Sequence, residues 1–413
     1  MPALVPKLRF PEFRDTGGWQ ERPLGDFLSE SRLPGSKGNV AKKITVKLWG
    51  NGVFQKNDTV QGSINTQYFR RKAGQFIYSK LDFLNQAFGI IPPSLDNFES
   101  TVDLPCFDLA DGLNSVFLLE YVKRREFYER LGETADGSRK ARRIHAETFL
   151  SFPIALPTLL EQQKIADCLS SVDELIAAQA RNVDALKTHK KGLMQQLFPR
   201  EDETQPQLRF PEFKNAGEWE KKRLEDLSKR GSGHTPSKSD PEYYNGGIKW
   251  VSLADSKRLD NGLIFDTAIH ISEKGIQNSS AVLHPAGTVL VSRDAGVGKS
   301  AIMSEPMAVS QHFIAWACNP RLLSNWFLYH LLQNFKPQFE SAATGSTIKT
   351  IGLQFFVDLI FSIPALPEQQ RIVHCLNSLD NLISAEAKKH EALKIHKKWL
   401  TQQLFPSLGA TKQ

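Results

Sequence analysis

One long segment of the chain occurs twice, and this duplication limits the possible folds more than any other feature. Residues 161–199 and 368–406 are identical at 24 of 39 positions without a gap. A shorter repeat, LRFPEF followed by Gly and Trp, occurs at residues 8–19 and 208–219. Residues 27–150 and 227–360 lie between the repeats and share only a few short similar segments. The chain therefore predicts two modules of common ancestry, with a shared framework and different variable parts.

The two long repeats predict long helices. In each of them apolar residues recur at alternating steps of three and four over four heptads, which is typical of a coiled coil. Pro157 and Pro367 precede the segments, and Pro199 and Pro406 follow them, so each helix has natural limits. A core helix in an ordinary bundle is the alternative, but the length and the duplication favour two helices packed on each other. With one helix after each variable region, we expect antiparallel packing about a pseudo-twofold axis.

Polar residues interrupt both apolar seams and predict the alignment of the two helices. These residues are Gln179, Lys190, Glu386 and Lys397. In one antiparallel alignment Lys190 faces Glu386, and Lys397 faces Gln179. In the other, Lys190 faces Leu379 and Lys397 faces Val172. Burying a charge without a partner costs several kcal/mol, so we expect the first alignment.

Each variable region has about 130 residues, the size of one domain. Alternating apolar runs at residues 74–79 and 288–292 predict strands, and residues 117–130 and 322–335 predict helices. The expected fold class is α+β, with two globular mixed α/β modules separated by two long antiparallel coiled-coil helices. The expected boundaries are 1–157 for the first module, 158–200 for the first helix, 201–367 for the second module and 368–413 for the second helix.

Basic and polar residues gather in the expected turns of both modules. The net charge is +7 and the pI is about 9.1, which fits a nucleic-acid partner but does not by itself establish one. Arg and Lys neutralise phosphates, while Arg, Gln, Ser and Thr also read base edges. A solvated surface charge is the alternative for any single residue. The candidate DNA-binding residues are Arg70, Arg71, Lys80, Ser138, Arg139, Lys140, Arg142 and Arg143 in the first module, and His234, Thr235, Ser237, Lys238, Lys249, Trp250, Arg293, Lys299, Gln311, His312, Ser346, Thr347 and Lys349 in the second.

No motif for catalysis or metal binding stands out in the sequence. The four cysteines form no CxxC pair, and HExxH, Gly-x-Ser-x-Gly and the adenine-methyltransferase tetrapeptide are all missing. Residues 295–300 resemble the end of a phosphate-binding loop, but Arg293 occupies the position where that loop needs glycine. We therefore expect a hairpin turn there, and neither a catalytic residue nor a metal site in this chain. No apolar run approaches ~18 residues and no signal-peptide core is visible, so we expect a cytoplasmic protein.

The order of these blocks resembles the specificity subunit of type I restriction-modification enzymes. The resemblance rests on LRFPEF and Trp at the start of each half, the Ala-Leu-Pro run that ends each variable region, and EQQ(K/R)I at the start of each long helix. Tyr243-Tyr244, residues 248–251 and residues 344–347 also look like parts of that family's target-recognition domains. The resemblance covers essentially the whole chain.

The resemblance implies a non-catalytic subunit of a phage-defence complex. Each target-recognition domain would read one half of a bipartite, asymmetric site in double-stranded DNA, and the helices would set the spacing and dock two modification subunits. Those methyltransferase subunits would bring S-adenosylmethionine, and restriction subunits, with the motor and nuclease, would bring ATP and Mg²⁺; this chain would hold no cofactor. A DNA-reading subunit of another complex without a methyltransferase, and a scaffold that never touches DNA, remain the alternatives.

Overall fold

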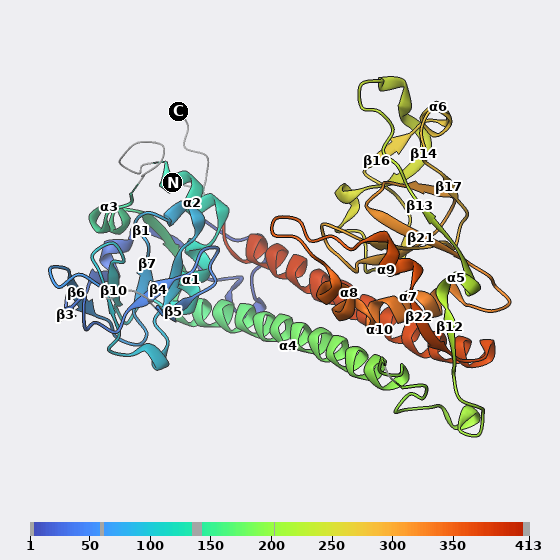
Figure 1. Ribbon diagram of the computed structural model, residues 1–413. Coiled ribbons are helices and arrows are strands. Elements are labelled where there is room, and N and C mark those ends of the chain that lie inside the picture. Colours follow the sequence, from blue (N-terminus) through green and yellow to red (C-terminus); the bar gives the residue numbers. More distant parts are fainter. Residues whose placement is uncertain (1–3, 58–61, 134–142, 202, 408–413) are drawn as a thin grey trace. The chain divides into compact units, whose positions relative to one another are not determined.

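The chain forms two compact units (Figure 1). The computed structural model describes residues 4–57, 62–133, 143–201 and 203–407. Unit 1 comprises residues 1–180 and 388–413, and unit 2 comprises residues 181–387. Each unit therefore combines one variable region with a part of both long helices. None of the described helices has both the length and the apolar character needed to cross a bilayer.

The two duplicated segments form the long helices α4 (Leu159–Leu197) and α10 (Leu366–Leu404). In unit 1 the first part of α4 packs on the last part of α10, and in unit 2 the last part of α4 packs on the first part of α10, so both units confirm the antiparallel pairing. Every predicted seam position is buried or half-buried, which confirms the heptad pattern. Helix α10 begins one residue before Pro367, because proline fits the first turn of a helix, where its missing N–H has no partner to lose.

The predicted alignment of the two helices is wrong. Lys190 Nζ lies 2.6 Å from Oδ1 of Asp380, next to Leu379. Lys397 Nζ lies 2.6 Å from Oδ2 of Asp173, next to Val172. Both contacts belong to the alignment that the sequence analysis rejected. The long lysine stem lets each ammonium reach an aspartate that flanks the seam.

The other two polar seam residues are Gln179 and Glu386. Gln179 is buried, and Glu386 accepts a hydrogen bond from Asn182 Nδ2 at 3.3 Å. The seam positions alone do not predict the partners of the lysines, because the aspartates occupy the adjacent positions.

Unit 1 is built from small antiparallel sheets around an aromatic core. The main sheet has the order β2-β10-β7-β8, beside a three-stranded sheet β3-β6-β9 and the pairs β1-β11 and β4-β5. The strands are β1 (Gln20–Pro23), β2 (Leu28–Glu30), β3 (Pro34–Lys37), β4 (Ile44–Val46), β5 (Val53–Gln55), β6 (Gln67–Arg70), β7 (Phe76–Tyr78), β8 (Phe88–Ile90), β9 (Glu99–Ser100), β10 (Cys106–Leu109) and β11 (Pro153–Leu156), and the helices are α1 (Ser115–Val122), α2 (Arg125–Gly132) and α3 (Ala146–Leu150). The core joins β7, α1 and α3 to the long helices through Leu169 of α4 and Leu404 of α10.

Unit 2 repeats this plan with longer strands. Its main sheet has the order β13-β21-β18-β19-β15, beside a second sheet β16-β14-β20-β17 and the pair β12-β22. The strands are β12 (Glu220–Arg223), β13 (Ser228–Ser232), β14 (Tyr244–Val251), β15 (Leu263–Ile264), β16 (Ile269–Ile271), β17 (Leu283–His284), β18 (Val289–Ser292), β19 (Ser300–Met303), β20 (Met307–Val309), β21 (Phe313–Cys318) and β22 (Ile360–Ile363), and the helices are α5 (Leu224–Leu227), α6 (Glu273–Gln277), α7 (Asn325–Asn334), α8 (Lys336–Ala342) and α9 (Leu353–Val357). The predicted strands at 74–79 and 288–292 are confirmed as β7 and β18.

The short repeat fastens each variable region to the start of the helix that follows it. In unit 1, Arg9 donates from Nε and Nη2 to the two carboxylate oxygens of Glu161 at 2.8 and 2.7 Å, and Trp19 Nε1 donates to the same carboxylate at 3.3 Å. The same contacts recur in unit 2 among Arg209, Trp219 and Glu368. Burial of these ion pairs explains why the repeat keeps Arg, Trp and Glu at matching positions.

Candidate nucleic-acid interface

In unit 2, turns from four parts of the sequence meet at one end of the sheets. The β18–β19 hairpin lies beside the turn after β20, because Arg293 N donates to His312 O at 2.9 Å. The segment after β13 joins them where His234 N donates to Val309 O at 3.1 Å. The fourth part is attached through Ile351, whose N–H donates to Arg293 O at 2.9 Å. Tertiary packing thus brings together most of the candidate residues of the second module.

Glycine makes the approach of the β13 segment possible. A side chain at Gly233 would place its Cβ 1.7 Å from the carbonyl oxygen of Val309. Because such a contact cannot be relieved by moving a side chain, only glycine fits there. The close approach places Thr235 Oγ1 2.5 Å from Oε1 of Gln311, so the threonine fixes that amide. The Gln311 Nε2 group then faces away from this contact and can donate to a ligand.

His312 and Asp294 form a second polar pair in this cluster. His312 Nδ1 lies 2.8 Å from Oδ2 of Asp294. The other oxygen of Asp294 is buried and has no hydrogen-bond partner among the described residues. The pair fixes the orientation of the imidazole ring, whose Nε2 remains available to a ligand.

The loop at residues 345–349 carries three further candidates, Ser346, Thr347 and Lys349. Thr344 and Thr350 close it with two backbone hydrogen bonds of 3.1 and 2.8 Å. Gly345 has φ +119°, a conformation that other residues rarely adopt. All five residues of the loop are exposed. It therefore presents hydroxyls and an ammonium on a short, closed support.

Lys299 and Lys349 line a common cavity of about 520 Å³ next to the β18–β19 hairpin. The hairpin confirms the expected turn at residues 295–300, since a strand and not a helix follows it. Lys299 donates to the backbone and side-chain oxygens of Ser256 at 3.0 Å, and Glu340 adds a carboxylate to the lining of the same cavity. Lys336, which is not among the predicted residues, also lines this cavity and pairs with Asp260 at 2.9 Å. A lysine at the start of an ordinary helix gives no sequence signal for such a role.

Two candidates of unit 2 have structural roles instead. Trp250 is 4% exposed, so its selection as a DNA-contacting residue is wrong; its indole N–H donates to His234 O at 3.2 Å and supports the turn. Lys249 is occupied by Glu305 at 2.9 Å and by the carbonyl of Phe265 at 2.6 Å. Trp250 and Lys249 both lie on β14, and these contacts hold their side chains in place.

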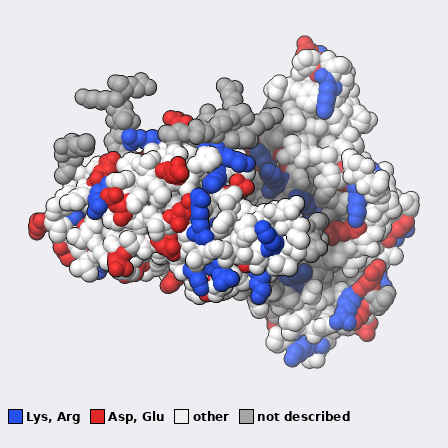
Figure 2. Space-filling view, turned by 90° about the vertical axis from the view of Figure 1, so that its left-hand side faces the viewer, with Lys and Arg blue, Asp and Glu red and all other residues white. Residues whose placement is uncertain are grey.

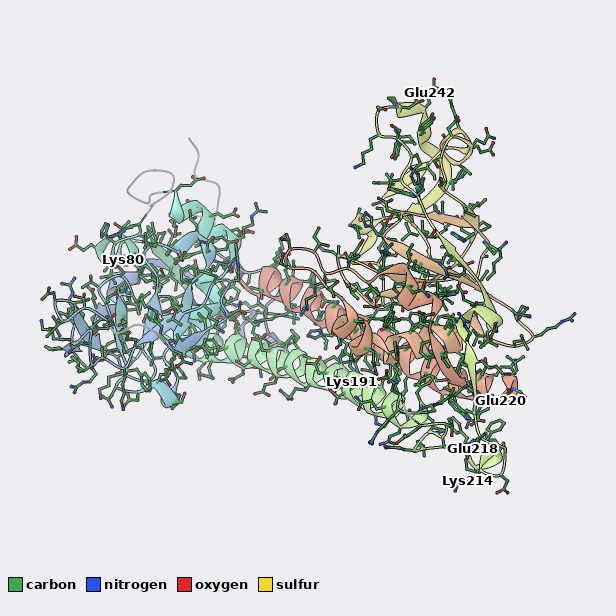
Figure 3. The ribbon with its side chains drawn as sticks, viewed as in Figure 1. Lys80, Lys191, Lys214, Glu218, Glu220 and Glu242 are labelled. Carbon is green, nitrogen blue, oxygen red and sulfur yellow. The ribbon has the colours of Figure 1, made fainter. Side chains whose placement is uncertain are left out.

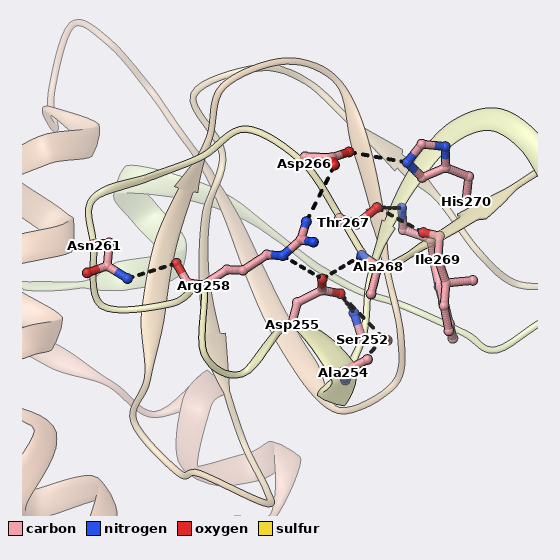
Figure 4. Close-up of polar contacts among 11 residues, drawn as sticks. Ser252, Ala254, Asp255, Arg258, Asn261, Asp266, Thr267, Ala268, Ile269 and His270 are labelled. Atoms are coloured by element: carbon pink, nitrogen blue, oxygen red, sulfur yellow. Dashed lines mark hydrogen bonds and ion pairs between the residues drawn. The ribbon is translucent and has the colours of Figure 1, made fainter. Parts of the chain in front are cut away.

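A buried carboxylate network links the turn after β14 to the segment before β16 (Figure 4). Asp255 is fully buried and accepts hydrogen bonds from the backbone N–H groups of Ser252 and Ala268 at 3.0 and 2.7 Å. Arg258 lies 3.7 Å from Asp255 and 3.6 Å from Asp266, so it links the buried acid to the surface.

The last two candidates of this unit, Ser237 and Lys238, are exposed, and Ser237 Oγ lies 2.7 Å from Ser239 Oγ.

In unit 1 the structure brings together two candidates, Lys80 and Arg143. Ile144 N donates to Lys80 O at 3.1 Å, and Lys80 N donates to Asp103 O at 3.0 Å. Arg143 lies 3.6 Å from the Asp103 carboxylate. Figure 3 labels Lys80, and Figure 2 shows that both signs of charge occur on the displayed face of unit 1. Charge alone therefore does not define an interface there.

The remaining candidates of unit 1 differ in burial, and some lie outside the described residues. Arg71 is 2% exposed and donates to Ser100 Oγ and to the carbonyls of Ser31 and Leu104, so its selection as a DNA contact is wrong. Arg70 is exposed at the end of β6. Ser138, Arg139, Lys140 and Arg142 lie outside the described residues.

The described residues include no group of three or more His, Cys, Asp or Glu side chains arranged to hold a metal ion. The chemistry available in the cluster of unit 2 is hydrogen bonding by amide, hydroxyl and imidazole groups, together with two ammonium groups. This combination suits a polyanion whose edges carry donors and acceptors.

Known proteins are similar to this chain in sequence and in fold. It is 27% identical over 189 residues to the type I restriction enzyme MjaIX specificity subunit of Methanocaldococcus jannaschii, a match that covers 44% of each chain. It is 28% identical over 265 residues to the EcoR124I/EcoR124II specificity subunit of Escherichia coli, covering 61% of each. The chain thus matches less than two thirds of the length of these curated relatives.

Solved structures agree in fold. A chain from a study of complex assembly and conformational transition of the type I R-M system matches with TM-score 0.63 at 16% identity, covering 94% of this chain and 98% of that one. The type I restriction-modification S subunit from M. genitalium matches with TM-score 0.56 at 14% identity, covering 98% and 100%. The family model of the type I restriction modification DNA specificity domain matches twice, at residues 16–188 and 216–394. With two copies that cover most of its length, this chain belongs to the type I restriction modification DNA specificity domain family.

Proposed function

We propose that this chain is the DNA-reading subunit of a type I restriction-modification complex and is not catalytic by itself. Each variable region reads one half of a bipartite DNA site, and α4 and α10 set the distance between the halves. Two modification subunits dock on the chain and methylate adenine with S-adenosylmethionine, and restriction subunits supply ATP- and Mg²⁺-dependent cleavage. The family and the names of its relatives support this assignment.

The observation that carries the proposal is the convergence of four separate turns in unit 2. Gln311, His312 and Thr347 bring side chains that read base edges, and Lys299 and Lys349 bring charges that suit phosphates. A scaffold that binds only proteins has no need for this combination.

The direct test uses the chain co-expressed with the modification subunit of its own system. Sequencing that detects methylated adenine in the host genome, with and without the gene for this chain, identifies the target. The complex should then bind a duplex with that target more tightly than a shuffled duplex, and log affinity should fall linearly with log salt. If adenine methylation does not depend on this chain, the proposal is wrong.

The role of the helices has a separate test. Inserting one heptad at matched points of α4 and α10 keeps the seams in register and lengthens the pair by about 10 Å. That length corresponds to roughly three base pairs, so the preferred spacer between the half-sites should grow. An unchanged spacer would show that the helices do not measure it.

A further inference from the structure

Unit 1 contains a cavity of about 400 Å³ that the proposed DNA contacts do not use. One wall is the turn between α1 and α2, which contributes Lys123, Arg124 and Tyr128. The other wall is the end of α10, which contributes Lys398 and Gln402. The cavity therefore lies where a recognition module meets a long helix of the same unit.

The cavity has an unused hydrogen-bond donor in its wall. Arg124 is 9% exposed, and its guanidinium lies 4.1 Å from the centre of the Tyr121 ring and 4.9 Å from that of Phe405. Its Nη1 donates to Pro406 O at 2.9 Å and its Nε to Tyr121 O at 3.3 Å. Its Nη2 is buried and has no partner among the described residues. A buried charged donor without an acceptor is unfavourable, so the wall is built to receive one.

The charges around the cavity favour an anion. Four basic residues, Lys123, Arg124, Arg125 and Lys398, line the cavity with two acidic ones, Glu120 and Glu126. Glu120 pairs with Lys123 at 3.1 Å and with Lys397 at 3.1 Å, so that carboxylate is already used. Lys398 is exposed and extends the positive wall along α10. Arginine with an open N–H matches the geometry of a carboxylate.

An apolar stripe on α10 leads into the cavity. Ile395 is 70% exposed and Trp399 is 49% exposed. Ile395 precedes Lys398 and Gln402 by three and seven residues, and Trp399 precedes Gln402 by three, so these side chains share one helix face. Large apolar side chains beside a basic cavity suit an amphipathic protein segment, whereas a DNA backbone has no apolar face to cover them.

The corresponding cavity of unit 2 has neither an arginine at the place of Arg124 nor large apolar residues at the places of Ile395 and Trp399. It has a volume of about 580 Å³ and lies between the end of α4 and the α7–α8 turn. Asn334 stands where unit 1 has Arg124, and Thr188 and Gly192 occupy the places of Ile395 and Trp399 in the duplicated helix. The second unit is thus an internal control for the first.

We infer that the cavity of unit 1 binds an acidic side chain of a protein partner, carried on a helix whose apolar face covers Ile395 and Trp399. The inference rests on the proposed function, in which that partner is a modification subunit. The carboxylate accepts a hydrogen bond from Arg124 Nη2 and is held by Lys398. The two docking sites of the chain are then chemically different, although the helices that carry them are repeats.

The test is the stoichiometry of the complex formed with the co-expressed modification subunit, measured by native mass spectrometry. Ile395→Asp with Lys398→Glu changes two exposed positions and leaves the core untouched. The variant should retain one modification subunit where the unaltered chain holds two, with at least a tenfold loss of affinity for the second. The matched variant Thr188→Asp with Lys191→Glu, at the equivalent positions of α4, should retain both.

A third variant addresses the buried donor itself. Arg124→Met removes the guanidinium, and near-ultraviolet circular dichroism shows whether the aromatic core of unit 1 is kept. With that core intact, the variant should lose the same modification subunit.

The outcomes separate the inference from the proposed function. If the Ile395→Asp, Lys398→Glu variant holds both subunits with unchanged affinity, the inference is wrong and the proposed function stands. If that variant keeps both subunits but binds DNA with a shallower salt dependence, the cavity holds a phosphate and the inference is also wrong. If the unaltered chain recruits no modification subunit, the proposed function itself fails.

Discussion

Lys190 Nζ lies 2.6 Å from one carboxylate oxygen of Asp380 and 2.7 Å from the other, so a seam residue of α4 is neutralised by a flanking residue of α10. Unit 1 repeats the relationship between Lys397 and Asp173, and adds Glu120 of α1 at 3.1 Å. Burial by itself lowers the pKa of Lys397, but the nearby carboxylates of Glu120 and Asp173 outweigh it and leave that pKa above its usual value. Each seam lysine is therefore matched by a carboxylate within its own unit.

Replacing Asp380 by Asn should destabilise unit 2 by about 1 kcal/mol, because Lys190 would keep its charge beside Leu379 without a carboxylate. The magnitude is small because Asp380 is 39% exposed and solvent screens the pair. Urea unfolding measures the difference. Glu220→Gln, which removes an exposed pair with Lys222, is the control and should be nearly neutral; equal costs of the two substitutions would contradict the role of the contact between Lys190 and Asp380.

The same contact shows which parts of the fold the sequence could predict. The helices and the strands β7 and β18 follow from periodic patterns within one segment, and the structure confirms them. The alignment of two helices depends on contacts between residues about 190 positions apart, as for Lys190 and Asp380. A lysine side chain is long enough to reach a residue beside the seam position that it faces. Seam positions alone therefore predict the wrong alignment.

The residues of the candidate site are also only partly predictable from the sequence. Exposed turns in the second module were identified from polar composition, and four of them meet in space. Composition did not distinguish Arg71 and Trp250, which look like surface residues in sequence but are buried by strands distant in the chain. Burial of a long polar side chain depends on tertiary packing, and no local pattern reports it.

The ion pair between Arg9 and Glu161 should contribute strongly to the stability of unit 1. Glu161→Gln leaves a buried guanidinium without its counter-charge, and we expect a loss of about 3 kcal/mol. Denaturant unfolding followed by tryptophan fluorescence measures it, since Trp19 contacts the same carboxylate. Glu12→Gln removes the exposed pair with Lys164 and should cause no measurable loss. Equal effects of the two substitutions would contradict the role of burial.

His330 should make unit 2 less stable in mild acid. Burial lowers its pKa to about 4 from an ordinary 6.5, against the hydrogen bond between its Nε2 and Asn377 Oδ1, with Lys190 and Asp380 as the charged neighbours. The folded protein keeps the ring neutral while the unfolded chain takes up a proton, so stability falls as pH drops below 6.5 and the fall ends near 4. The expected loss from this group between pH 6.5 and pH 5 is about 2 kcal/mol.

Urea unfolding at several pH values checks this expectation. His330→Gln keeps a donor for Asn377 and removes the titration, so its stability should depend less on pH over this interval. A variant with the same pH dependence as the unaltered chain would show that other groups cause the loss.

Two substitutions in unit 2 should affect DNA binding in different ways. Lys349 is an exposed ammonium on the closed loop, and Lys349→Ala should weaken binding to all duplexes alike and reduce the slope of log affinity against log salt by about one. Thr235 donates to one lone pair of the Gln311 amide oxygen and so orients the amide. The second lone pair of Oε1 and the Nε2 group can then pair with the N6–H and N7 of adenine. Gln311→Ala should therefore leave the salt slope unchanged and reduce the preference for one base pair by about 1–3 kcal/mol. Binding of the complex to the target duplex and to its single-base variants, over a series of salt concentrations, measures both quantities. Loss of base preference in Lys349→Ala, together with unchanged preference in Gln311→Ala, would reverse these two roles.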